Sequence, residues 1–269
     1  MLSLYDAATQ EVEPIRPGHP RQLKVLTVAP VLADPADPDL AQLRGWLLAD
    51  QLRRTAERRS LVPTVCEVFA PGTTGAEPLA AEVRAALNFH PPARIAPAGE
   101  PVQATVEFAG GGPPAFDIGT GDTGWLAGLD VIRYHAATGT VSTGGGPRRW
   151  SELIDRDVDP LALRVVLTRH RYREDAPVTW DLLAAAGQML TIWRGLVAEW
   201  ANSPSAAMPE RYADAVTAAF DDDLDAMSAT AQLMMLIIDP QVAPGAKFET
   251  FAAADRLLGL DLARDVGRY

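Results

Sequence analysis

A strand–helix–strand pattern between residues 23 and 69 constrains the fold of this chain more than any other feature. Residues 23–31, LKVLTVAPV, are nearly all apolar or β-branched, which is typical of a buried parallel strand. Asp39 can cap the helix that follows, and leucines recur along one side of that helix. A second strand follows over residues 61–69. Such a unit predicts a parallel sheet with its ligand crevice at the carboxyl ends of the strands.

The remaining pattern divides the chain into two parts. Further strands are expected over residues 2–5, 102–108, 116–122 and 132–134, with a helix over 77–87. The proline-containing stretches 7–21 and 89–99 are expected to be irregular. After residue 159 only helices are expected, over residues 161–168, 178–200, 210–220, 226–238 and 248–258. The fold class is therefore predicted to be α/β, with a parallel-sheet domain over 1–158 and an antiparallel α-helical bundle over 159–269.

Composition narrows the classes of function. The net charge of −11 argues against broad nucleic-acid binding, because neutralising phosphates needs clustered basic residues, and no DNA partner is expected. Cys66 is the single cysteine, so no disulfide can form within the chain. We find neither a secretory leader pattern nor a run of 18 apolar residues, and we therefore expect a cytoplasmic protein with no membrane partner.

Several pieces, in the same order along the chain, resemble the cysteinyl-tRNA synthetases, which are class I aminoacyl-tRNA synthetases, and their relative, the cysteine ligase of mycothiol biosynthesis. The pieces are LYDAATQEVEPIRPG, LRGWLLADQLRRTAERRSLVPTVCEV, FDIGTGD, VSTGGGPRRWSELIDRDVDPLALRVVLTRHRYR, FDDDLDAMSATAQL and RLLGLDLA. The resemblance implies a Rossmann-like domain of the HUP type followed by the synthetase stem and bundle. The chain looks like a truncated, degenerate member, with the family's insertion reduced to residues 70–115.

The two signature motifs of that family are altered here. Its His-Ile-Gly-His motif, which stabilises charge on the ATP phosphates, is matched by Asp39–Gln42, so that a carboxylate takes the place of an imidazole. Alternatively, Asp39 only caps its helix. Its Lys-Met-Ser-Lys-Ser motif is matched by residues 145–150, where Arg148 and Arg149 are candidate phosphate ligands. The alternative is a solvated basic turn near Glu152.

A glycine-rich turn is the other candidate remnant of a nucleotide pocket. Gly119 and Gly121 would allow close backbone approach, and Asp122 could accept hydrogen bonds from ribose hydroxyls; a plain turn is the alternative. The family's zinc ligands are missing near Val28 and over residues 122–130, so zinc is not expected as a cofactor. ATP stays open as a cofactor, and Cys66 is interpreted as a buried, inert thiol in a strand.

The residues 169–173 form a dense basic segment. Arg169, Arg171 and Arg173 could contact RNA phosphates while Tyr172 stacks on a base. The alternative is an interdomain hinge paired with nearby acids. The run 221–223 of three aspartates is interpreted as a solvated loop, with Asp225 capping the next helix.

Three hypotheses of function follow. The favoured one is a non-catalytic paralog, a pseudoenzyme that has lost the ATP signature motifs and serves as a scaffold or binding protein for an unidentified protein or small molecule. The second is a repurposed ATP-dependent amino-acid ligase that forms an adenylate, as the mycothiol-pathway enzyme does. The third is a tRNA- or RNA-binding module that acts through residues 169–173, and it is the least favoured.

Overall fold

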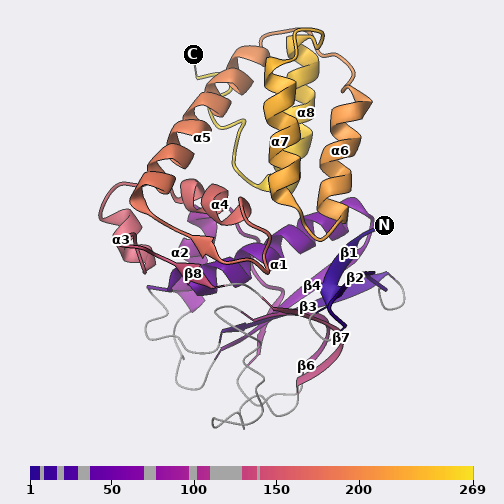
Figure 1. Cartoon of the computed structure of the whole chain (residues 1–269), viewed down its shortest axis with the longest axis vertical. Helices are drawn as coiled ribbons and strands as arrows, with labels where there is room; N and C mark the ends of the chain where they lie inside the picture. Colours follow the sequence, from indigo (N-terminus) through magenta and orange to yellow (C-terminus); the bar gives the residue numbers. More distant parts are fainter. Residues whose placement is uncertain are drawn as a thin grey trace.

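The fold is described from a computed structural model of the chain. The structure describes residues 1–6, 9–16, 21–29, 37–69, 77–96, 102–109, 129–137 and 140–268. Within these ranges it contains a parallel sheet, a layer of helices and two small strand pairs (Figure 1).

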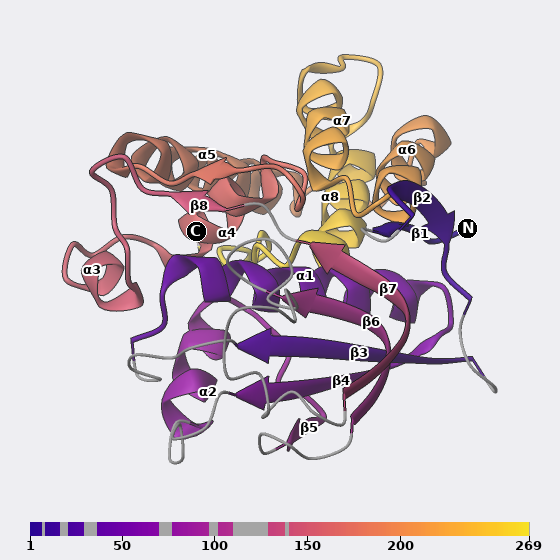
Figure 2. The same cartoon turned by 60° about the horizontal axis from the view of Figure 1, so that its bottom comes forward.

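Five parallel strands make up the main sheet, in the order β5-β4-β3-β6-β7. They are β3 (Gln22–Ala29), β4 (Val62–Phe69), β5 (Arg94–Ala96), β6 (Val102–Ala109) and β7 (Leu129–Ala137). Helix α1 (Leu40–Arg58) joins β3 to β4, and α2 (Glu77–Ala86) joins β4 to β5. The order reverses between β3 and β6, which is where open parallel sheets form a ligand crevice. Figure 2 shows the strands pointing toward the end of the molecule where α1 begins and α3 (Trp150–Ile154) lies.

Helix α1 is the centre of the molecule, because it is packed on opposite sides. Leu48 and Leu52 pack with Leu23 and Val25 of the sheet. Leu43, by contrast, belongs to a second core shared with the C-terminal helices. Figure 2 shows α1 lying between the sheet and these helices. The apolar spacing of the sequence thus predicts the helix, but this spacing does not reveal that both sides are covered.

The C-terminal half of the described chain is mostly helical. Its helices are α4 (Pro160–Thr168), α5 (Trp180–Trp200), α6 (Glu210–Asp221), α7 (Ala226–Ile238) and α8 (Pro244–Leu258). Helix α8 begins four residues before the expected position 248, because Pro244 occupies the first turn, where a missing N–H costs nothing. The core that joins these helices also contains residues of α1 and α2, so apolar packing runs across the predicted boundary at residue 158.

Short strands account for the main differences from the predicted elements. Strands β1 (Ser3–Asp6) and β2 (Glu11–Pro14) form an antiparallel pair, although residues 7–21 are expected to be irregular. Strand β5 lies inside the stretch 89–99, which is also expected to be irregular. Strands β8 (Val141–Ser142) and β9 (Ala176–Pro177) pair in parallel. Strands of two to four residues carry too little periodicity to be predicted, and their partners in space decide them. In the described part of the chain, no helix has both the length and the apolar character needed to span a bilayer.

Candidate functional site

The start of α1 and the segment 148–151 lie against each other at the crevice end of the sheet. The backbone N–H of Leu40 donates to the carbonyl of Arg148 at 3.1 Å, and the N–H of Trp150 donates to the carbonyl of Pro38 at 3.1 Å. Asp39 and Arg149 form an isolated antiparallel bridge. The fold therefore brings together two segments far apart in the sequence, the start of α1 and residues 148–150, which the resemblance aligns with the two signature motifs.

Two carboxylates of the chain itself lie at this junction. Asp39 is the N-cap of α1, as its position in the sequence predicts, and its Oδ1 accepts from the N–H of Gln42 at 2.8 Å. Asp37 accepts from the N–H and the hydroxyl of Ser151 at 2.7 and 2.8 Å. A guanidinium nitrogen of Arg149 lies 3.6 Å from Asp37. The amide end of a helix attracts anions, and here the side chain of Asp39 already occupies part of that position.

Two buried polar side chains at the first turns of α1, Gln42 and Thr27, find no partner among the residues that the structure describes. The side-chain amide of Gln42 and the hydroxyl of Thr27 make no hydrogen bond within the described ranges, although these residues are only 7% and 4% exposed. Thr27 pairs in register with Glu67 on β4, and Glu67 accepts from the indole of Trp46. Gln42 precedes Trp46 by one turn on α1, so both orphaned groups lie at the same end of the α1–β3 contact. Buried polar groups are normally satisfied, and those left unpaired at a crevice suit a ligand.

An ion pair between Glu67 and Arg84 lies beside Gln42 and Thr27. Glu67 is fully buried and accepts from Arg84 of α2 as well as from Trp46. The guanidinium of Arg84 lies 4.1 Å from the ring centroid of Trp46. Burial raises the pKa of Glu67, and this effect outweighs the opposing charge of Arg84 and the hydrogen bonds from Trp46 and Arg84.

The three glycines before Arg148 have a structural explanation. Gly144 and Gly145 have φ angles of +38° and +86°, which side-chain-bearing residues rarely adopt. A Cβ on Gly146 would lie 2.3 Å from the carbonyl oxygen of Val178, so this backbone packs directly on the chain before α5. Arg148 is exposed, and its backbone N–H donates to Glu152 at 3.3 Å. The loop is thus a tight turn held against residue 178, with Arg148 exposed beside it.

Other predicted nucleotide or metal positions are not all visible. Gly119, Gly121 and Asp122 lie outside the described residues, as does most of the segment 122–130. Across the described ranges, no group of three or more His, Cys, Asp or Glu side chains is arranged to hold a metal ion. Cys66 lies in β4 as predicted, but it is only partly buried; burial raises the pKa of its thiol.

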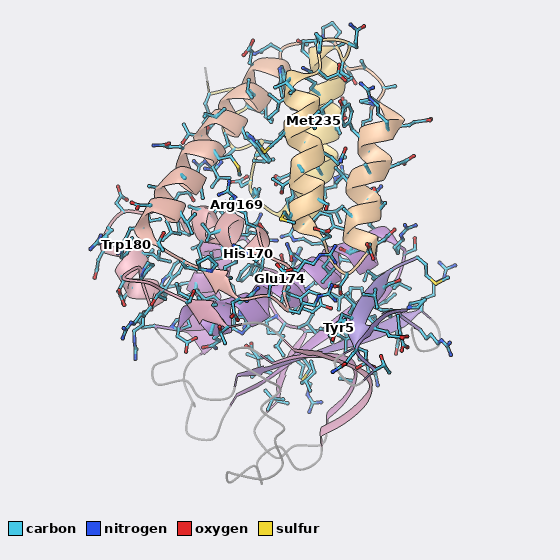
Figure 3. All side chains as sticks on the ribbon, in the orientation of Figure 1. Tyr5, Arg169, His170, Glu174, Trp180 and Met235 are labelled. Atoms are coloured by element: carbon cyan, nitrogen blue, oxygen red, sulfur yellow. The ribbon has the colours of Figure 1, made fainter. Side chains whose placement is uncertain are left out.

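The basic segment 169–173 is paired with the aspartates after α6. Arg171 contacts Asp225 at 2.8 Å and Asp223 at 3.7 Å. Arg173 lies 3.4 Å from Asp223, and the hydroxyl of Tyr172 donates to Asp223 at 2.5 Å. Arg169 is the C-cap of α4 and is exposed, and Figure 3 shows it near His170 and Glu174. Arg171 and Arg173 are thus paired with acids, and Tyr172, at 3% exposure, does not offer its ring for stacking.

One expectation about the aspartate run is wrong. Asp223 is fully buried and Asp221 is 6% exposed, whereas the sequence predicts a solvated loop over 221–223; of the three, Asp222 is exposed as predicted. The reason is that Arg59, the residue that caps the C-terminus of α1, pairs with Asp221, while Arg171 and Arg173 pair with Asp223. The cap on α7 is confirmed, because Asp225 accepts from the N–H of Ser228 at 2.9 Å.

Sequence reasoning missed a second basic group, on the C-terminal half of α1. The run LRRTAERRS contains four arginines, Arg53, Arg54, Arg58 and Arg59. Its signal is two arginine pairs spaced five residues apart in an acidic chain. It also missed the buried carboxylate of Asp50, which contacts Arg54 and Arg164 at 2.7 and 2.6 Å.

Comparison with known proteins shows partial similarity to one kind of enzyme. The chain is 41% identical over 81 residues to the L-cysteine:1D-myo-inositol 2-amino-2-deoxy-alpha-D-glucopyranoside ligase of Cellulomonas flavigena, covering 30% of this chain and 19% of the relative. It is 33% identical over 118 residues to the ligase of that name from Geodermatophilus obscurus, covering 42% and 27%. With that of Clavibacter michiganensis it shares 31% identity over 172 residues, covering 58% and 39%.

These matches are confined to a part of each protein. The matched regions span about a fifth to two fifths of the length of these relatives. No profile of a known protein family matches the chain. The chain is therefore similar, over part of its length, to the mycothiol-type cysteine ligases, a group related to the class I aminoacyl-tRNA synthetases.

Proposed function

We propose that this chain is a ligase-like binding protein that does not form an aminoacyl adenylate. In this proposal, a Rossmann-like sheet domain of the HUP type and a helical bundle form an inherited scaffold. The single observation that carries the proposal is the closed junction at the start of α1. Asp39 caps the helix there, and Asp37 holds Ser151 and Arg149.

Electrostatics make this junction unsuitable for a triphosphate. A phosphate needs N–H donors and cations, whereas Asp39 already accepts from one amide of the first turn and carries negative charge. Arg149 is shared with Asp37, which leaves Arg148 as the more exposed cation of the pair. Like charges at a few ångströms repel by about 1 kcal/mol in water and by more where solvent is excluded.

The orphaned side chains point to the kind of ligand that remains compatible. Gln42 offers both a donor and an acceptor, and the hydroxyl of Thr27 can do either. Neither group carries a charge. The site therefore suits an uncharged polar ligand, such as a nucleoside or an amide, better than a nucleotide.

The test compares adenosine with Mg·ATP by isothermal titration calorimetry, with Asp39→Asn as the central variant. Asparagine caps a helix as well as aspartate does, so the fold is kept while one negative charge is removed. We expect adenosine to bind the native chain more tightly than Mg·ATP, and Asp39→Asn to tighten ATP binding by about 2- to 5-fold, the effect of one charge at a helix end. Gln42→Leu should weaken adenosine binding. Asp181→Asn, in the first turn of α5, is the matched control and should change neither affinity.

Pyrophosphate exchange decides between this proposal and an active ligase. We expect no exchange of labelled pyrophosphate into ATP with L-cysteine or any other amino acid. Exchange above background with the native chain, abolished by Arg148→Ala, would show that the chain is an ATP-dependent ligase instead. The partial similarity to the cysteine ligases is the observation that keeps this second candidate in view.

An RNA-binding role has less support, because the acidic partners of Arg171 and Arg173 already neutralise them. It predicts tRNA binding that weakens with rising salt and with Arg171→Ala. Salt-independent or absent binding would exclude it.

A further inference from the structure

A cavity lies along the C-terminal half of α1, far from the crevice at the start of that helix. Its volume is about 380 Å³. The side chains that matter for its chemistry are Arg54 and Arg58 of α1, His90, and Ala253, Arg256 and Leu257 of α8. At 1.5 Å per residue, Arg58 lies about 24 Å along the helix axis from Gln42. The cavity is therefore separate from the site described above.

Positive charge dominates this cavity, although the whole chain carries a net charge of −11. Three arginines and one histidine line it, against the one carboxylate of Glu57. That carboxylate already pairs with Arg53 at 2.9 Å. Basic side chains therefore outnumber acidic ones in this cavity, although acidic residues outnumber basic ones in the whole chain.

These cationic groups differ in how far the fold already uses them. Arg54 is committed, because it donates to Asp50 at 2.7 Å and to the carbonyl of Asn88 at 2.7 Å. Arg58 donates to Thr217 at 2.6 Å, which leaves most of its fork of donors unused. Arg256 is exposed, and its guanidinium makes no ion pair or hydrogen bond with other described residues. Arg58 and Arg256 each lie in the last turn of a helix, where a cation is favourable, but helix ends alone do not explain why both face one cavity.

His90 contributes a polar atom whose orientation is fixed. Its Nδ1 lies 2.7 Å from Oδ1 of Asp50, and its backbone N–H donates to the same oxygen at 2.9 Å. The ring is thus held by a buried carboxylate, and Nε2 is the ring nitrogen left for a ligand. A carboxylate that orients one imidazole nitrogen while the other binds a ligand is a recurrent arrangement in binding sites.

Size and apolar lining limit the ligand to a small molecule. Small-molecule sites usually have volumes of about 300–1,000 Å³, and this cavity lies at the lower end of that range. Ala253 and Leu257 supply an apolar surface for a ring or carbon chain. Arginine forks match the geometry of phosphoryl oxygens in bidentate contacts.

We propose that this cavity binds a small organic phosphate, with the phosphoryl group between Arg58, Arg256 and Nε2 of His90 and the carbon part against Leu257. The ligand is about the size of a sugar monophosphate. Its binding does not depend on the crevice at the start of α1, and the two sites are tested separately.

The experiment titrates the whole chain with inorganic phosphate and with D-glucose 6-phosphate, using glucose and sodium chloride of equal ionic strength as blanks. We expect both phosphates to bind and to raise the melting temperature, and the two blanks to do neither. Arg256→Gln and Arg58→Gln should each weaken binding by about 10-fold, the loss of one charge-assisted contact. The exposed Arg268, outside the cavity, gives the control Arg268→Gln, which should bind as the native chain does.

Several results would overturn the proposal. Absence of binding by both phosphates at about 10 mM would exclude a site of even millimolar affinity. Equal weakening by Arg256→Gln and Arg268→Gln would show general charge screening instead of a site. Binding of tRNA that requires Arg58, without binding of either small phosphate, would assign the surface to RNA. Asp39→Asn should leave phosphate binding unchanged, so failure here is distinguishable from failure of the proposed function.

Discussion

Replacing Asp50 by asparagine tests what holds the sheet and the helices together. The Asp50 carboxylate is 1% exposed, and it faces the guanidinium of Arg164, which is fully buried. Its Oδ2 accepts from Arg164 at 2.6 Å and from Arg54 at 2.7 Å, while Oδ1 accepts from His90. Asparagine has one acceptor oxygen. If that oxygen faces the two arginines, its NH₂ group meets the N–H of His90, which is also a donor.

The expected cost is large because a buried charge is left without its counterion. Removing one partner of such a pair costs about 3–5 kcal/mol of the free energy of unfolding. For a chain of this size 1 kcal/mol corresponds to about 2–4 °C, so we expect the melting temperature to fall by roughly 6–20 °C.

The same pair predicts a dependence on pH. Burial alone would raise the pKa of Asp50, but Arg164, the hydrogen bond from His90 and Arg54 together hold that pKa well below its usual range. The folded chain thus binds this proton less readily than the unfolded chain does. The stabilisation is fully present above the unfolded pKa of about 4 and is lost progressively as the pH falls from there through the much lower folded pKa. The difference in stability between the native chain and Asp50→Asn should therefore shrink in acid.

Urea denaturation followed by circular dichroism at pH 7 and at pH 3.5 measures both effects. Asp265→Asn is the control, because Asp265 pairs with Arg264 and Arg268 at the surface, and it should cost under about 0.5 kcal/mol. The double variant Asp50→Asn with Arg164→Met should cost less than the sum of the single changes. A loss from Asp50→Asn no larger than that from Asp265→Asn would refute this reasoning.

Two further substitutions test packing by the same denaturation assay. Gly146→Ala should lower the free energy of unfolding by about 1–3 kcal/mol, because the added Cβ would lie 2.3 Å from the carbonyl oxygen of Val178. Gly187→Ala, where nothing lies within 4 Å of the added Cβ, should instead stabilise α5. Equal effects of the two changes would contradict the explanation of the turn. Trp193→Ala should lower the free energy of unfolding by about 3–5 kcal/mol, because the Trp193 ring is buried and packs edge-on against Phe251, with ring centroids 5.3 Å apart. Ile192→Ala, at a side chain that is 60% exposed, should lower it by less than about 0.5 kcal/mol. A similar loss for both would contradict the assigned core.

The sequence predicts the long elements well, because their periodicity is local. Helix α7 has the predicted bounds, β4 begins and ends within a residue of the predicted positions, and α1 begins directly after Asp39. The cap at Asp39 follows from the residue type and its place before a helix.

What the sequence leaves open depends on contacts between distant residues. Asp50 and Arg164 are 114 positions apart, and no local pattern pairs them. The burial of Asp223, which the sequence places in solvent, follows from arginines supplied by another segment. Strand β5 likewise depends on the register that β4 offers.

The start of α1 shows most clearly what the sequence alone determines and what depends on tertiary structure. The sequence by itself determines that an acidic residue, Asp39, precedes a predicted helix, and that two arginines, Arg148 and Arg149, follow a glycine run in a distant loop. Only the tertiary structure decides that these positions meet, with Asp37 on Ser151 and Asp39 bridged to Arg149. Residue types and periodicity act over a few positions of the chain, whereas a site is formed by the crossing of strands and helices, which depends on the packing of the whole molecule.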